Sequence, residues 1–307
     1  MNANEFILIH EDGYHTTVYP SLSDQETIKG TVVVLHGLAE HHNRYREFSL
    51  FLNNNGYDVY LYDHRGHGTD KKLTDLGYIA DSRGWEKLIL DAVDVLSYVS
   101  DHKRGKKLIL FGHSMGSLIA RGATEYSDLV NAAVFCGTTA PSMIDSMSGL
   151  LVTNIVKLLK GKRHISPFLN NALFGRKPYR ALSERTQNDW LTRSNAAVGL
   201  YMNDPYCGFI CTAGLYHDLV KLATVVTKPA NIKSTRKDLP IFFLSGDCDP
   251  VGGYGNEVMK LFETYKSLGF TNVDCTLYEN CRHELLNELN RHEIMADILA
   301  FIDKVSS

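Results

Sequence analysis

The chain lacks several features that would assign it to a common class of proteins before any motif is considered. Its 32 lysine and arginine residues nearly balance 35 acidic residues, which gives a formal net charge of −3, and no long run carries charge of one sign. A nucleic acid requires a basic face on its protein partner. No nucleic-acid partner is therefore expected.

Long apolar runs are also missing. No window approaches the roughly 20 apolar residues that a membrane-spanning helix needs. Residues 1–10 contain Glu5 and no basic flank ahead of their short apolar stretch, unlike a secretory signal or a transit peptide. We therefore expect a cytoplasmic protein.

Cysteines are few and scattered, and no two of them form a C-x-x-C pair. Neither a zinc cage nor a disulfide framework is predicted from this spacing, and we expect no metal and no cofactor. Cys248 and Cys281 come close in sequence to residues considered below as catalytic, and whether either thiol lies near the site is left open. The six cysteines are Cys136, Cys207, Cys211, Cys248, Cys275 and Cys281.

Short β-branched or aromatic runs alternate with segments of helical periodicity. This alternation is typical of an α/β protein with a mostly parallel central sheet flanked by helices. An antiparallel hairpin is expected at the start, from residues 5–9 and 16–19. Further strands are predicted at 31–35, 58–62, 108–111, 132–136, 241–244 and 273–278, and helices at 45–53, 85–96, 117–126, 256–268 and 289–305.

The alternation stops after the sixth predicted strand. The next strand begins at residue 241, about 100 residues later, whereas a strand-helix-strand unit takes about 30 residues in all. The chain between is rich in helix-forming residues. We therefore predict a helical cap at residues 141–225, inserted into a core domain made of residues 1–140 and 226–307.

Residues 112–116 read G-H-S-M-G and join the strand at 108–111 to the helix at 117–126. A serine between two glycines at such a junction is typical of a nucleophile elbow, a tight turn that lifts the serine hydroxyl clear of the sheet. Ser114 is therefore the candidate nucleophile. The backbone N–H of the next residue, Met115, is the first candidate donor to an oxyanion.

Serine needs a histidine to take its proton and a carboxylate to orient that histidine. In an open α/β sheet such residues lie just beyond the carboxyl ends of the strands. His283 follows the last predicted strand, whereas Asp247 and Asp249 both follow the strand at 241–244. The position after a strand predicts His283 as the base and leaves two candidates for the acid.

The second oxyanion donor is expected after the strand at 31–35, and we assign it to the backbone N–H of Leu38. A metal site made of the nearby His36, His41 and His42 with Glu40 is an alternative, but no helical H-E-x-x-H pattern supports it. The residues from Asp63 to Gly68 could also form a metal or phosphate site. A structural turn is the favoured interpretation there.

Taken together, these stretches resemble the monoacylglycerol lipase and lysophospholipase branch of the α/β-hydrolase superfamily, which is also catalogued with serine aminopeptidases. The resemblance covers nearly the whole predicted core and fades in the cap. Gly252 and Gly253 make their loop more similar to bacterial members than to animal ones. The matching pieces are His36 to His42 with Arg44 and Tyr45, Asp63 to Gly68, His113 to Met115, Asn203 to Tyr206, Gly246, Asp249, Val251, and His283 to Glu288.

This resemblance implies that Asp249, rather than Asp247, completes a triad with Ser114 and His283. It also implies hydrolysis of an acyl ester, of monoacylglycerol or lysophospholipid type or of a shorter kind, through an acyl-serine intermediate. Three roles stay open for the apolar cap stretch at residues 150–159: lining an acyl channel, transient contact with a membrane surface, or packing against the core.

Two other functions are compatible with the sequence, an aminopeptidase and a binding protein without catalytic activity. An aminopeptidase would need acidic side chains in the cap to bind the substrate amine, and Glu184, Asp189 and Asp204 are the candidates. A binding protein of the same fold without catalysis is the second alternative, but such proteins commonly lose a triad residue and all three are present. The sequence gives no expectation for the oligomeric state.

Overall fold

The computed structural model describes residues 5–175, 179, 182 and 185–306. Within them a single sheet has the strand order β1-β2-β4-β3-β5-β6-β7-β8. The strands are β1 (Phe6–Ile9), β2 (His15–Ser21), β3 (Gly30–Leu35), β4 (Tyr57–Tyr62), β5 (Lys107–His113), β6 (Ala132–Cys136), β7 (Ile241–Gly246) and β8 (Val273–Tyr278).

The sheet is mostly parallel. β1 and β2 form the predicted antiparallel hairpin, and β2 pairs antiparallel with β4. From β4 to β8 every pairing is parallel. All residues of β3, β4, β6 and β7 are buried, as expected for strands covered on both faces. The predicted fold class is confirmed.

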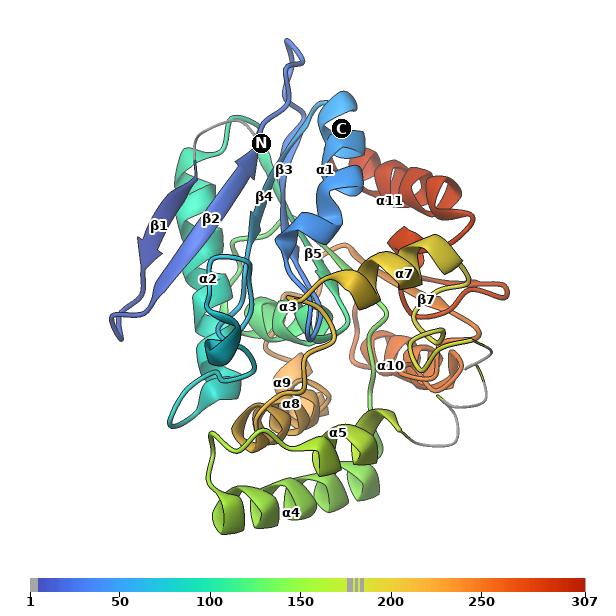
Figure 1. Ribbon diagram of the computed structural model, residues 1–307. Coiled ribbons are helices and arrows are strands. Elements are labelled where there is room, and N and C mark those ends of the chain that lie inside the picture. The colour runs from blue at the N-terminus through green and yellow to red at the C-terminus, as the bar shows by residue number, and fades with distance from the viewer. Residues whose placement is uncertain (1–4, 176–178, 180–181, 183–184, 307) are drawn as a thin grey trace.

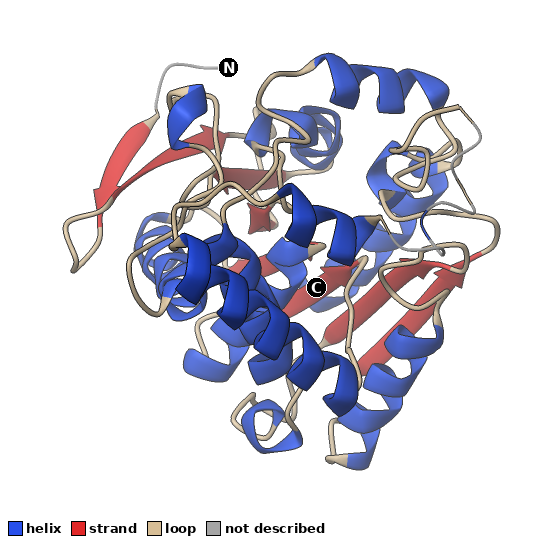
Figure 2. Ribbon diagram, turned by 60° about the horizontal axis from the view of Figure 1, so that its bottom comes forward, coloured by secondary structure: helices blue, strands red, loops and turns tan. Residues whose placement is uncertain are grey.

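Helices cover both faces of the sheet (Figure 2). On one face, α1 (Arg46–Asn54) and α11 (Arg291–Ser306) pack their apolar residues against the strands. On the other face lie α2 (Gly84–His102), α3 (Met115–Tyr126) and α10 (Asn256–Ser267). Short 3-10 turns occur at His42–Tyr45, Leu73–Asp75 and Leu285–Asn287.

The chain between β6 and β7 is helical, as predicted for an insertion after the sixth strand. In Figure 1, α4 and α5 form the bottom of the molecule, below α8 and α9. α8 also contributes buried residues to the core that α2 and α3 share. The segment contains α4 (Met143–Lys160), α5 (Pro167–Phe174), α7 (Asn195–Asn203), α8 (Ala213–Val226) and α9 (Pro229–Ile232). Its limits as a functional cap, 141 and 225, stay predictions.

α4 turns most of its apolar side chains outward. Leu151, Leu158 and Leu159 are 62%, 73% and 77% exposed. Its inward face contains Ser146 and Thr153, which are buried, and Val156, which packs against the core. Packing against the core, one of the three roles left open for residues 150–159, therefore does not apply to these leucines. Among the described residues, no helix is both long enough and apolar enough to cross a membrane.

Candidate active site

The nucleophile elbow forms where the sequence predicted it, between the end of β5 and the start of α3. Ser114 has φ 53° and ψ −120°, a strained conformation for a residue with a side chain. The flanking glycines are required by contact: a β-carbon on Gly112 would collide with the carbonyl oxygen of Gly116. A β-carbon on Gly116 would in turn collide with the carbonyl oxygens of Leu35 and His36.

Ser114, His283 and Asp249 are joined by hydrogen bonds. The Nε2 atom of His283 lies 2.8 Å from Ser114 Oγ, and its Nδ1 atom lies 2.9 Å from Asp249 Oδ2. Asp249 follows β7 and His283 follows β8. Because β5, β7 and β8 run parallel, both residues lie at the carboxyl edge of the sheet, where Ser114 follows β5. With Nδ1 donating to the carboxylate, Nε2 is free to accept the serine proton.

Of the two candidate aspartates, Asp247 and Asp249, only Asp249 lies within hydrogen-bond distance of His283. His283 bonds to Asp249, whose side chain is fully buried, and not to Asp247, whose backbone N–H donates to Tyr278. Burial of the imidazole favours its neutral form, but the charge of Asp249 and the hydrogen bond to it outweigh burial and raise the pKa of His283. The pair thus favours the protonated form of the imidazole.

The two predicted oxyanion donors lie at the same cavity. Leu38 and Met115 both line it, and neither backbone N–H donates to another described residue. The loop before Leu38 passes close to the nucleophile, because a β-carbon on Gly37 would lie 3.1 Å from Ser114 Cβ. Free N–H groups on both sides of a serine suit the binding of a developing oxyanion.

A buried ionic network holds this loop, and sequence reasoning did not identify it. Glu40 accepts hydrogen bonds from the Gly37 N–H at 2.5 Å and the Tyr45 hydroxyl at 2.8 Å. Arg44 bridges Glu40 to Glu284, donating two hydrogen bonds of 2.6 and 2.7 Å to Glu284. Because Glu284 follows His283 directly, Arg44 links the oxyanion loop to the loop of the base. The i, i+4 spacing of Glu40 and Arg44 was the available sequence signal.

The histidines near this loop each bond to a different partner. They do not form the alternative metal site of His36, His41 and His42 with Glu40. His67 Nε2 accepts the N–H of Ala39 at 3.1 Å, and His36 Nε2 accepts the N–H of His64. His42 bonds to Asp63, whereas His41 bonds to Asp204. These contacts fit the structural interpretation of the turn at Asp63 to Gly68.

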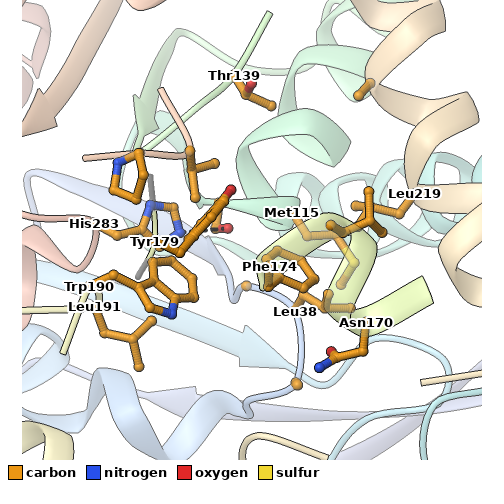
Figure 3. A pocket seen from close by; sticks show the side chains of 18 of the residues that line it. Leu38, Met115, Thr139, Asn170, Phe174, Tyr179, Trp190, Leu191, Leu219 and His283 are labelled. Atoms are coloured by element: carbon orange, nitrogen blue, oxygen red, sulfur yellow. Dashed lines mark hydrogen bonds between the residues drawn. The ribbon is translucent and has the colours of Figure 1, made fainter. Parts of the chain in front are cut away.

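A cavity of about 650 Å³ opens above Ser114, within the size range of small-molecule sites. Leu38, Met115, Phe174 and Leu219 gather on one side of it, and Trp190 and Leu191 lie beside His283 (Figure 3). Thr139, Asn188 and Glu257 add polar atoms to the wall. The described wall of the cavity thus combines a group of apolar side chains with polar ones, and Ser114 is part of it.

α4 reaches this cavity through Asp145, Ser146 and Gly149 rather than through residues 150–159. The exposed leucines at 151, 158 and 159 point away from it because they lie on the opposite face of the same helix. Lining an acyl channel, another of the roles left open, therefore does not apply to these leucines.

Two of the three candidates for an amine-binding pocket do not reach the cavity. Asp189 accepts the backbone N–H groups of Arg185 and Thr186, and Asp204 pairs with His41. Neither aspartate lines the cavity, and Glu184 lies outside the described residues. Cys248 and Cys281 are likewise absent from its described wall.

Comparison with known proteins identifies relatives along nearly the whole chain. The human monoglyceride lipase is 28% identical over 268 residues, which cover 86% of this chain and 78% of the relative. The monoacylglycerol lipase of Mycolicibacterium smegmatis is 26% identical over 292 residues, covering 93% and 92%. A thermostable carboxyl esterase from Bacillus coagulans superposes with a TM-score of 0.83 at 23% identity, over 99% of both chains.

These relatives confirm the resemblance to the monoacylglycerol lipase branch, whereas a bacterial origin stays a prediction. The family described as "Serine aminopeptidase, S33" matches residues 26–290, a span that contains the elbow, both oxyanion donors and the Asp249 and His283 loops. This protein is a member of the serine aminopeptidase S33 family of α/β-hydrolases.

Proposed function

We propose that this protein is a serine carboxylic-ester hydrolase that cleaves monoacylglycerols or similar single-chain acyl esters. The observation that carries this proposal is the hydrogen-bonded series Ser114, His283, Asp249, whose first two members line a cavity that also contains apolar side chains. The names of the relatives support the substrate class.

In this mechanism His283 takes the Ser114 proton as Oγ attacks the ester carbonyl carbon. The tetrahedral oxyanion accepts hydrogen bonds from the N–H groups of Leu38 and Met115. Asp249 accepts a hydrogen bond from Nδ1 of His283, which keeps Nε2 unprotonated in the neutral ring, and its charge stabilises the imidazolium form of His283. His283 then protonates the departing alcohol and later activates a water molecule, which releases the acid and restores the serine.

We place the acyl chain on the side of the cavity formed by Leu38, Met115 and Leu219, because methylene groups gain free energy by leaving water for apolar surroundings. The alcohol must leave next to His283, so the head group takes the other side, towards Thr139 and Glu257. Residues 141–225 would act as the cap that sets the length of this acyl site.

We further propose that the cap touches a lipid surface from the cytoplasm. Met143, Ile144 and Met147 at the start of α4 are 78%, 80% and 66% exposed, and Leu158 and Leu159 continue the same face. So large an exposed apolar surface is unusual on a protein that meets only water. Flotation with lipid vesicles tests this: Met147→Glu with Leu158→Glu should abolish binding, whereas equal flotation of that double variant contradicts it.

The activity is tested with a panel of monoacylglycerols, lysophospholipids, short p-nitrophenyl esters and aminoacyl amides. The proposal expects monoacylglycerols to give the highest kcat/KM. Preference for the shortest acyl group would contradict a lipase role, and amide turnover without ester turnover would favour an aminopeptidase. Lack of turnover together with lack of fluorophosphonate labelling would indicate a binding protein.

A further inference from the structure

A cluster of three side chains outside the catalytic residues has the donor set of a transition-metal site. One potential ligand atom from each of His41, Asp204 and Cys207 lies within 4.8 Å of the other two. His41 and Cys207 are buried, and Asp204 is partly exposed. Imidazole nitrogen, carboxylate oxygen and thiolate sulfur are together the ligands that Zn²⁺ prefers.

The cluster spans the boundary between the core and the insertion. His41 lies three residues after the oxyanion donor Leu38, whereas Asp204 and Cys207 occupy the turn that follows α7 (Figure 1). That turn is already attached to the oxyanion loop by a hydrogen bond of 2.9 Å from the Gly208 N–H to the Ala39 carbonyl. A metal here would join the same two segments.

The side chains are free to bind a cation at little cost in existing contacts. His41 Nε2 lies 2.9 Å from Asp204 Oδ2, a distance that a metal could bridge after small side-chain shifts. The other ring nitrogen of His41 is buried without a hydrogen-bond partner, and the Cys207 thiol makes no hydrogen bond to the described residues. Binding therefore replaces one hydrogen bond.

Burial is the main obstacle to binding through Cys207, because it favours the neutral thiol over the thiolate. A divalent cation bonded to the sulfur supplies the positive partner that the thiolate requires. Asp204, the carboxylate of the same cluster, adds a negative charge that favours a cation at this place.

We propose that His41, Asp204 and Cys207 form a binding site for one Zn²⁺ ion that ties the turn after α7 to the oxyanion loop. The metal forms bonds to a histidine nitrogen, an Asp204 oxygen and the Cys207 sulfur, and the thiol proton is released to solvent. Solvent water supplies the fourth ligand of a tetrahedral site. This site does not depend on the ester hydrolase function.

The test is calorimetric titration of the full chain with ZnCl₂ in two buffers of different ionisation enthalpy, which measures both affinity and the released proton. One saturable site is expected. Cys207→Ser should weaken it by more than the about 10- to 100-fold that loss of an outer-sphere partner costs. Cys275→Ser, a partly buried cysteine on β8 whose sulfur contacts Met259, is the matched control and should bind like the wild type.

Co²⁺ provides a measurement that does not need a variant to fold. The wild-type Co²⁺ complex should show a thiolate-to-metal charge-transfer absorption, and Zn²⁺ should raise the Tm of the wild type but not of Cys207→Ser. Mg²⁺, which prefers oxygen ligands, should do neither. Absence of a saturable Zn²⁺ site, a Co²⁺ complex without the thiolate band, or Cys207→Ser binding equal to wild type would each overturn the proposal.

Discussion

The Nε2 atom of His283 lies 2.8 Å from the hydroxyl oxygen of Ser114, although 169 residues separate them in the chain. At this distance the imidazole can take the serine proton without rearrangement. The approach depends on the parallel sheet, which ends β5 and β8 at the same edge with β6 and β7 between them. Predictions about catalysis follow from this contact and from the groups that hold it.

Ser114→Ala removes the proposed nucleophile. We expect kcat to fall by about 10⁴- to 10⁶-fold, as for other enzymes of this mechanism. Labelling with a fluorophosphonate should disappear, whereas Tm should stay near the wild-type value. If the variant still labels, another residue is the nucleophile.

Asp249→Asn should lower kcat by about 10⁴-fold, because the amide no longer fixes the tautomer that leaves Nε2 of His283 unprotonated. Asp247→Asn is a close control, since this residue lies two positions earlier and does not bond to His283. Steady-state kinetics of the pair measure the difference. Equal losses in both variants would remove the assignment of Asp249.

The raised pKa of His283 predicts the acidic limb of the pH profile. As pH falls through this pKa the imidazole gains a proton and can no longer accept one from Ser114, so kcat/KM should drop about tenfold per pH unit. Asp249 raises the pKa by its charge and hydrogen bond, against the effect of burial. The limb should therefore lie above the ordinary histidine value of about 6.5.

Removing the Asp249 charge should move the acidic limb of the pH profile in a defined direction. Residual activity of Asp249→Asn should show its acidic limb at lower pH than the wild type, because the effect of burial on His283 is then opposed only by the more weakly acting carboxylates of Glu284 and Glu40. The measurement is kcat/KM between pH 4.5 and 9. A limb that moves to higher pH would contradict the electrostatic role of the carboxylate.

Gly37→Ala tests the oxyanion loop. The added methyl group would lie 2.7 Å from Glu40 Oε1 and 3.1 Å from Ser114 Cβ, so the loop must shift. We expect kcat to fall about 10- to 100-fold, less than the loss of about 10²- to 10³-fold when a donor is removed outright. Gly199→Ala on α7, with nothing within 4 Å of the added carbon, should keep wild-type kcat. Unchanged kcat in Gly37→Ala would argue against the Leu38 assignment.

Leu219→Trp tests the placement of the acyl chain. The larger side chain would project into the apolar side of the cavity, so kcat/KM for long-chain esters should fall at least about tenfold relative to short-chain esters, since each excluded methylene costs about 0.8 kcal/mol. Leu90→Trp, at an exposed position on α2, is the control for adding the same side chain. An unaltered chain-length profile would place the acyl chain elsewhere.

Local patterns were enough to predict most of the strands and helices of the core and the tight turn at Ser114. Strands and helices begin and end within a few residues of their predicted bounds, because apolar periodicity and turn residues are properties of short segments. The helix predicted at 85–96 continues to His102, with Val99 buried on the same face. The tight turn at Ser114 could also be predicted locally. A serine between two glycines at a strand-to-helix junction indicates such a turn, because side chains at the glycine positions would collide with neighbouring backbone.

The α/β class, the segment after the sixth strand, and the order serine, acid, histidine at strand ends could all be predicted from short stretches of sequence. Packing in three dimensions was needed to show that His283 bonds to Asp249, that Arg44 joins Glu40 to Glu284, that α4 turns its leucines outward, and that His41 lies beside Asp204 and Cys207. The physical reason is distance along the chain: each of these outcomes depends on how separate segments pack, and no short pattern encodes the orientation of one segment against another.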